Sequence, residues 1–169
     1  MDRITRGSSA GYNHAFIVDQ ARRDELIALD PKSDEILKPI LRGRDVQRFR
    51  YHWAGYYLID VHNGYTDEHG HRVQPVNIND YPVLKKHLDQ FWDKISNRQD
   101  RGVTPYNLRN CAYYTEFAKE RVVWIELVDQ GRFSLVEPDV FINNTMYMMS
   151  GDHLRYLCGL LKSRLINWY

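Results

Sequence analysis

The sequence has little cysteine and no long apolar run, and both absences narrow the possibilities. Cys111 and Cys158 are the only cysteines in 169 residues, which gives neither a disulfide framework nor the ligand spacing of a zinc site. We therefore predict reduced thiols in a cytoplasmic protein. No apolar stretch approaches the roughly 20 residues of a membrane-spanning helix, and no signal peptide opens the chain, so we expect no membrane partner.

The sequence also lacks a surplus of charge of one sign. Its 23 lysines and arginines against 22 acidic residues leave a formal net charge of +1. This balance argues against a protein that wraps nucleic acid with its whole surface, but it permits a basic patch on one side. The 43% hydrophobic and 13% aromatic residues are enough for a folded core. We predict a single domain over residues 1–169, and both ends resemble cut points within a longer protein.

Motifs for catalysis are missing as well. There is no glycine-rich phosphate loop, no Gly-x-Ser-x-Gly turn and no His-Glu-x-x-His helix. Asp100 and Glu126 could form a nuclease carboxylate pair, but no lysine stands at short spacing from them. One loop gathers five possible metal ligands without the spacing of a known closed site: Asp60, His62, Asp67, His69 and His71. We predict no catalytic residue, no metal and no cofactor in this chain.

The order of hydrophobic patterns predicts an α+β fold, with a mixed or antiparallel β-sheet and amphipathic helices packed on it. Strands are expected over residues 15–19, 48–53, 56–60, 121–127, 133–136 and 145–149. Helices are expected over residues 22–29, 33–37, 82–95, 113–119 and 153–165, with Ser33 as the cap of the second. The third has one apolar stripe, formed by Leu84, Leu88, Phe91, Trp92 and Ile95. Residues 97–110 are polar and are expected to form a long, free loop around Gly102 and Pro105.

The most distinctive stretch concentrates basic side chains beside aromatic rings. It contains Arg42, Arg44, Arg48, Arg50 and His52, interleaved with Phe49, Tyr51 and Trp53. Its alternation predicts a two-faced strand with the rings inward and the arginines outward, followed by a turn at residues 54–55. The planar guanidinium group suits phosphate and guanine recognition, and arginine is used here in place of lysine throughout.

A second polar segment, residues 97–110, offers similar groups in Arg98, Arg101, Tyr106, Asn107 and Arg109. Arginine pairs with guanine, and asparagine pairs with adenine. A charge-rich stretch is often only a solvated face with carboxylate partners, such as Asp45 or Glu35 for the first stretch. The side-chain chemistry by itself leaves nucleic-acid binding and a solvated face about equally supported.

Several phrases of the sequence together resemble a known family. They are Gly11-Tyr12-Asn13 with Ala15-Phe16-Ile17-Val18-Asp19, Asp30-Pro31-Lys32-Ser33, Ile36-Leu37-Lys38-Pro39, Leu41-Arg42-Gly43-Arg44-Asp45 with Arg48 and Tyr51, Tyr81-Pro82, Tyr106-Asn107-Leu108-Arg109, and the Tyr156-Leu157-x-Gly159-Leu160-Leu161-x-Ser163-x-Leu165 helix. In this order they resemble the TaqI-like C-terminal specificity domain of adenine-specific DNA methyltransferases, especially of type IIG restriction-modification enzymes. The resemblance covers nearly the whole chain.

The resemblance implies a target recognition domain that holds double-stranded DNA and reads base edges. It also implies a parent protein whose methyltransferase domain binds S-adenosylmethionine and methylates adenine, in many members together with a nuclease. The Asn-Pro-Pro-Tyr signature of that domain is absent here. The chain is therefore expected to recognise DNA and to catalyse nothing alone. Two other classes remain open: a module that docks on a partner subunit, and a small metal-dependent nuclease.

The resemblance also suggests which polar segment contacts phosphates and which reads bases. Arg42, Arg44, Arg48, Arg50 and His52 lie within or beside the family-like phrases, so we assign them to phosphate contact and local structure. We assign base reading to the second segment, namely to Arg98, Arg101, Tyr106, Asn107 and Arg109. Phosphate contacts supply most of the affinity for DNA, whereas base contacts supply specificity.

Overall fold

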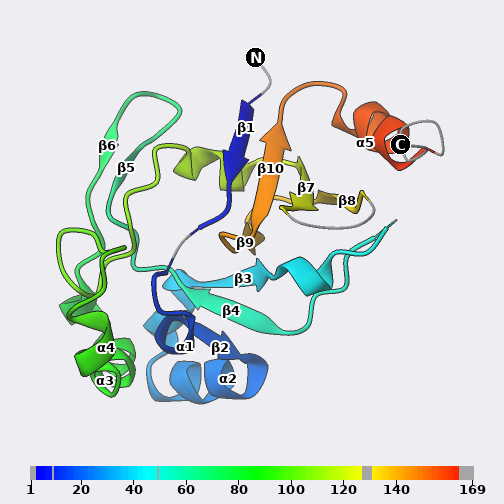
Figure 1. Cartoon of the computed structure of the whole chain (residues 1–169). Coiled ribbons are helices and arrows are strands. Elements are labelled where there is room, and N and C mark those ends of the chain that lie inside the picture. Colours follow the sequence, from blue (N-terminus) through cyan, green and yellow to red (C-terminus); the bar gives the residue numbers. More distant parts are fainter. Residues whose placement is uncertain (1–2, 9, 49, 127–130, 164–169) are drawn as a thin grey trace. The chain divides into compact units, whose positions relative to one another are not determined.

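The computed structural model describes residues 3–8, 10–48, 50–126 and 131–163 (Figure 1). The chain divides into two compact units, each assembled from separate stretches of sequence, where the sequence predicts one domain. Unit 1 consists of Met1–Ser8, Ile40–Ala54 and Glu116–Tyr169, and unit 2 of Ser9–Pro39 and Gly55–Thr115. None of the helices in the described part of the chain has the length and apolar character that a bilayer crossing requires.

The elements of both units follow in chain order. Unit 1 contains β1 (Arg3–Arg6), the 3-10 helix η2 (Gly43–Asp45), β7 (Arg121–Ile125), β8 (Phe133–Val136), β9 (Phe141–Ile142), β10 (Met146–Ser150) and α5 (Leu154–Lys162). Unit 2 contains α1 (Asn13–Phe16), β2 (Ile17–Asp19), α2 (Gln20–Leu29), η1 (Pro31–Ile36), β4 (Tyr56–Ile59), β5 (Tyr65–Thr66), β6 (Arg72–Val73), η3 (Ile78–Asp80), α3 (Pro82–Asp89) and α4 (Trp92–Ile95). β3 (Leu37–Leu41) and η4 (Tyr114–Ala118) run across the sequence boundaries of the units.

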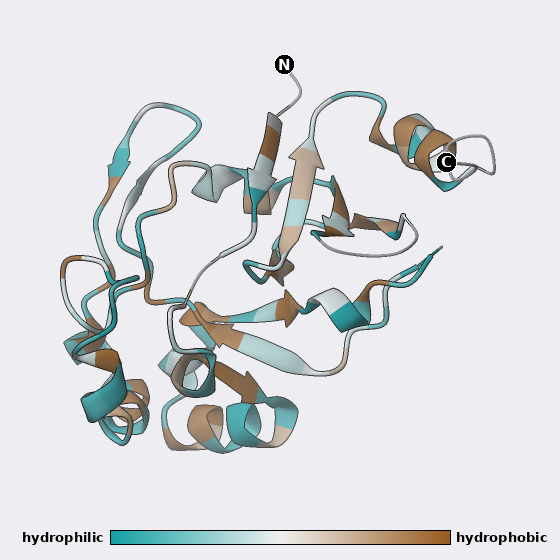
Figure 2. Ribbon diagram, viewed as in Figure 1, coloured by the Kyte–Doolittle hydropathy of each residue, from teal (hydrophilic) through white to brown (hydrophobic). Residues whose placement is uncertain are grey.

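Unit 1 is built on an antiparallel sheet in the order β1-β10-β7-β8. Alternate residues of β7 face opposite sides of this sheet, and Val122 packs with Met149, Leu154 and Cys158 under α5. Figure 2 shows the hydrophobic residues of α5 and the mostly hydrophilic loop that follows η2. β8 has the predicted bounds, and β7, β10 and α5 lie close to theirs. The predicted α+β class is therefore confirmed.

In unit 2, β4 pairs antiparallel with β2 and with residues 37–39 of β3. The last two residues of β3 pair in parallel with β9 of unit 1. The core of unit 2 includes side chains that are almost fully buried: Ala15, Phe16, Leu26, Leu58, Ile59, Leu84, Leu88 and Ile95. These apolar residues come from helices and strands alike, as expected for an α+β unit.

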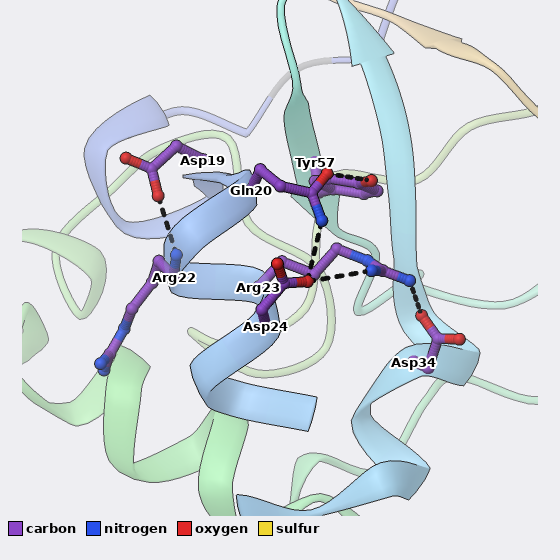
Figure 3. Close-up of polar contacts among 7 residues, drawn as sticks. All are labelled: Asp19, Gln20, Arg22, Arg23, Asp24, Asp34 and Tyr57. Carbon is purple, nitrogen blue, oxygen red and sulfur yellow. Dashed lines mark hydrogen bonds and ion pairs between the residues drawn. The ribbon is translucent and has the colours of Figure 1, made fainter. Parts of the chain in front are cut away.

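The helix α2 shows how several charged residues are used for structure (Figure 3). Asp19 caps it, because the Oδ1 atom accepts the backbone N–H of Arg22 at 2.9 Å. The Arg23 guanidinium pairs with Asp34 at 2.5 Å and lies 4.6 Å from the centre of the Tyr57 ring. The Tyr57 hydroxyl donates in turn to Gln20 at 2.7 Å. An arginine and an aspartate of this unit thus join α2 to its neighbours.

Three local predictions are wrong. Residues 13–16 form the helical turn α1, so the strand predicted over 15–19 is reduced to β2. Asp30, rather than Ser33, caps η1, since the Asp30 carboxylate accepts the backbone N–H of Lys32. The predicted helix over residues 82–95 is divided into α3 and α4, because the N–H of Gln90 turns back to the His87 carbonyl and Phe91 leaves helical geometry.

The strand predicted over residues 48–53 is also absent, and a tight reversal takes its place. Val46 forms an isolated antiparallel bridge with Tyr51, and the Gln47 N–H donates to the Arg50 carbonyl at 2.8 Å. β4 consequently pairs with β2 and β3, not with a strand directly before it. Phe49 lies outside the described residues, so its predicted inward orientation is untested. Hereafter, residues 42–52 are called the arginine turn.

Candidate DNA interface

The arginine turn is held together by an internal ion pair. Asp45 is buried and accepts three hydrogen bonds from Arg42, from the backbone N–H at 2.8 Å, from Nε at 3.2 Å and from Nη2 at 3.1 Å. The guanidinium group of Arg42 is therefore engaged within its own turn. Of the two roles predicted for Arg42, phosphate contact and local structure, the geometry supports the structural one.

The remaining basic residues of the arginine turn are exposed: Arg44, Arg48, Arg50 and His52. Tyr51 anchors this part of the turn, because its hydroxyl donates a hydrogen bond to Glu137, the residue after β8. Burial, together with Glu137, raises the pKa of Tyr51 to about 12, so the hydroxyl stays protonated and keeps donating at neutral pH. The fixed turn thus carries exposed cationic groups, the side chains that phosphate contact requires.

The second segment, residues 97–110, is organised around Arg98. This residue is only 7% exposed, and its guanidinium lies 4.5 Å from the centre of the Phe16 ring. It donates to backbone carbonyls of Ala10, Asp100, Pro105 and Asn107, at 2.6 Å in the case of Ala10. Burial lowers the pKa of Arg98 to about 10, which leaves it charged at neutral pH. The guanidinium points inward, which argues against the base-reading role that we predicted for it.

Asn107 is a second internal support of the same segment. It is 2% exposed, and its Nδ2 atom donates to the carbonyls of Val76 at 2.9 Å and His62 at 3.2 Å. Its Oδ1 atom accepts the hydroxyl of Thr104 at 2.6 Å. These bonds use the amide groups that would pair with adenine. Burial therefore argues against base reading by Asn107 too.

The loop is also closed tightly at Gly102. The Val103 N–H donates to Asn63 Oδ1 at 2.7 Å, and the Gly102 N–H donates to the Asn107 carbonyl at 3.0 Å. A Cβ atom on Gly102 would lie 2.3 Å from Asn63 Oδ1 and 2.7 Å from the backbone carbonyl oxygen of Leu108, so only glycine fits. The expectation of a loop around Gly102 is confirmed, but the expectation that it is free is wrong. Residues 97–110 are hereafter called the stapled loop.

The stapled loop presents a smaller set of groups to solvent than we predicted. Arg101 is exposed and donates to the Ser96 carbonyl at 2.9 Å. Arg109 is 65% exposed and lies 3.4 Å from Asp100, too weak a contact at a wet surface to hold it. Tyr106 is half-buried, with its hydroxyl bonded to Asp89. These three are the predicted base-reading residues whose side chains reach the surface.

One exposed residue beside the stapled loop was assigned to the core by the sequence pattern. Trp92 was placed on an apolar helical stripe, yet it is 43% exposed, whereas Ile95 of the same stripe is fully buried. The signal was present in the sequence. Phe91 and Trp92 are consecutive, and successive residues of a helix point about 100° apart, so one of the two must lie at the edge of the stripe.

The five possible metal ligands do not gather in the structure. Asp67 accepts the backbone N–H groups of His69 at 2.9 Å and His71 at 2.8 Å and thereby shapes its own turn. Asp60 is buried and accepts the Tyr114 hydroxyl. Within the ranges that the structure describes, no group of three or more His, Cys, Asp or Glu side chains could hold a metal ion. Glu126, of the imagined nuclease pair, forms an ion pair with Arg6 at 2.6 Å.

The buried Asp60 carboxyl leads to a prediction on pH. Burial raises its pKa from 3.8 to about 6, against the smaller opposing effects of Tyr114 and Lys38. The folded state therefore binds this proton more tightly, and the resulting stability is present below about pH 4 and lost as the pH rises through 6. Urea unfolding measures the free energy of unfolding of the wild type and of Asp60→Asn. The wild-type value minus the variant value should fall by about 2–3 kcal/mol between about pH 4 and pH 8. Burial lowers the pKa of His62, but this residue is present in both proteins, so its contribution to the pH dependence cancels in the difference. A constant difference would contradict the prediction.

The family is decided by comparison with known proteins. Residues 38–169 match the model of the TaqI-like C-terminal specificity domain. The chain belongs to this family. The match confirms the resemblance to these specificity domains that was drawn from the sequence. No curated protein matches the chain.

A solved structure supports the fold of the specificity domain. The type IIL restriction-modification enzyme MmeI, in complex with DNA, matches with a TM-score of 0.70 over 99% of this chain at 12% sequence identity. At this identity the similarity shows the fold alone. The chain spans only 21% of the MmeI chain, about a fifth of its length.

Proposed function

We propose that this chain is the sequence-specific DNA-binding domain of a type IIG restriction-modification enzyme. The family match over residues 38–169 carries the proposal, and the matching MmeI structure was solved with DNA. In this proposal, an adenine-specific methyltransferase domain of the parent binds S-adenosylmethionine and is the protein partner of this chain. The parent works in the cytoplasm, where Cys111 and Cys158 stay reduced.

Exposure divides the contacts between two sets of residues. Arg44, Arg48, Arg50 and His52 on the arginine turn contact DNA phosphates. Arg101, Tyr106 and Arg109 on the stapled loop contact base edges, where arginine can bond guanine with both donors of its fork. Three residues that the sequence analysis assigned to DNA contact instead hold the arginine turn and the stapled loop in place through internal hydrogen bonds: Arg42, Arg98 and Asn107.

We predict weak, salt-dependent binding of duplex DNA by this chain alone. A few phosphate contacts give non-specific dissociation constants of about 10⁻⁴ to 10⁻⁶ M, and the affinity falls as salt displaces them. Fluorescence anisotropy of a labelled duplex at several salt concentrations measures the dissociation constant and its dependence on salt. Sub-nanomolar binding at physiological salt would contradict the prediction. Salt-indifferent capture of a protein partner, without DNA binding, would favour the docking module instead.

The same preparation provides a control for catalysis. Incubated with duplex DNA, magnesium and S-adenosylmethionine, the chain should leave the DNA neither methylated nor cut. Turnover that survives purification would show that a catalytic site has been missed. For the parent, the gene sequence upstream is the direct test, and an Asn-Pro-Pro-Tyr motif there is the expected result.

A further inference from the structure

Trp92 exposes an aromatic surface that the fold of unit 2 does not use. Among the described residues of this unit, the large hydrophobic side chains that are clearly exposed are Leu29, Trp92 and Val103. Trp92 lies on α4, whose buried side is occupied by Ile95. Its ring centre lies 5.3 Å from that of Tyr106, so the two rings form one continuous aromatic face.

The side chain of Tyr106 is held by two charged residues of α3. Its hydroxyl is bonded to Asp89, and Lys85 Nζ lies 5.3 Å from the centre of its ring. Lys85 and Asp89 also pair with each other at 2.9 Å, one helical turn apart. The Tyr106 ring is therefore held in place by two charged residues. Trp92 packs on a preformed support, and its exposed face is available to a partner.

The segment that carries this aromatic face has a surplus of positive charge. Apart from the buried Arg98, residues 82–110 contain five lysines and arginines against three aspartates and no glutamate, a larger surplus than the +1 of the whole chain. Arg101 donates to the carbonyl of Ser96, whose own N–H donates to the carbonyl of Trp92. The cationic group of Arg101 is thus attached one helical turn from Trp92. A partner that carries apolar groups beside negatively charged phosphates complements such a surface.

We infer that Trp92 is a DNA-contact residue of this domain. With Tyr106 it packs against deoxyribose and thymine methyl groups at the edge of a duplex groove, while Arg101 and Arg109 contact the polar base edges beside them. This inference rests on the proposed function and adds to it an aromatic contact. These are the apolar groups that a duplex presents at its surface, because the ring faces of its bases are covered by stacked neighbours.

Two alanine variants of this chain test the inference. Leu29 is the matched control for Trp92, since it is 72% exposed, belongs to the same unit and lies on α2, outside residues 82–110. The probe is a labelled duplex with a randomised centre, titrated at low salt. Trp92→Ala should weaken binding about 5- to 100-fold through the loss of buried apolar surface, and Trp92→Phe should restore most of it. Leu29→Ala should change the affinity by less than about twofold.

Tryptophan fluorescence provides a reading that does not require Trp92→Ala to fold. Duplex DNA should quench the fluorescence of the wild-type chain, and the quenching at saturation should be smaller in Trp92→Phe. Absence of duplex binding by the wild type would refute the proposed function itself. If the wild type binds, unchanged affinity in Trp92→Ala, equal losses in Trp92→Ala and Leu29→Ala, or undiminished quenching in Trp92→Phe would each overturn this inference alone.

Discussion

Arg98→Ala should lower the free energy of unfolding by about 3–5 kcal/mol, a large effect for a residue in a polar loop. The substitution removes a buried guanidinium that donates to the carbonyls of four residues, and some of these carbonyls lose their partner without gaining water. The free energy of unfolding of Arg98→Lys should lie between those of the wild type and Arg98→Ala, because a single ammonium group cannot reach all four carbonyls. Urea unfolding followed by circular dichroism measures the difference.

Arg101→Ala is the matched control for Arg98→Ala. It removes the same side chain three residues later in the same loop, but Arg101 is exposed and donates to one carbonyl only. Its effect on stability should stay within about 0.5 kcal/mol, as for most surface substitutions. Equal stability losses in the two variants would show that Arg98 does not support the stapled loop.

Replacing Arg44, Arg48 and Arg50 together by alanine should lower the affinity for every DNA sequence alike. Each phosphate contact contributes about −0.9 to the slope of log K against log salt, so the slope should flatten by about 2 to 3. We expect an affinity loss on the order of 100-fold at low salt. Arg155→Ala is the control, since Arg155 is an exposed arginine on α5 of the same unit. Anisotropy titrations over a salt series provide both values.

The arginines of the stapled loop should behave differently from those of the arginine turn. In the full-length parent, Arg101→Ala or Arg109→Ala should relax the recognised sequence at one position, because a bidentate contact to the correct base is worth about 1–3 kcal/mol. Sequencing of methylated sites shows the recognised word for each variant. If the turn substitutions change the word and the loop substitutions leave it intact, the two roles are reversed.

Hydrophobic periodicity was enough to predict much of the fold. The apolar-rich run over residues 133–136 predicted β8 with the bounds that are found, and the apolar stripe beginning at Leu154 predicted α5. These patterns are reliable because one face of each element is buried, which requires apolar residues at a fixed period. Family-like phrases such as Leu41-Arg42-Gly43-Arg44-Asp45 also identified the family from the sequence, which the match over residues 38–169 confirmed.

The burial or exposure of individual arginines was decided only by the tertiary structure. Arg98 and Arg101 are the same residue type in the same loop, yet one is buried and the other is exposed. The difference arises because Arg98 donates to backbone carbonyls, including that of Ala10 far away in the sequence. Every residue has a carbonyl, so no residue type in the sequence marks these partners. Which guanidinium groups remain exposed therefore depends on how the chain folds back on itself.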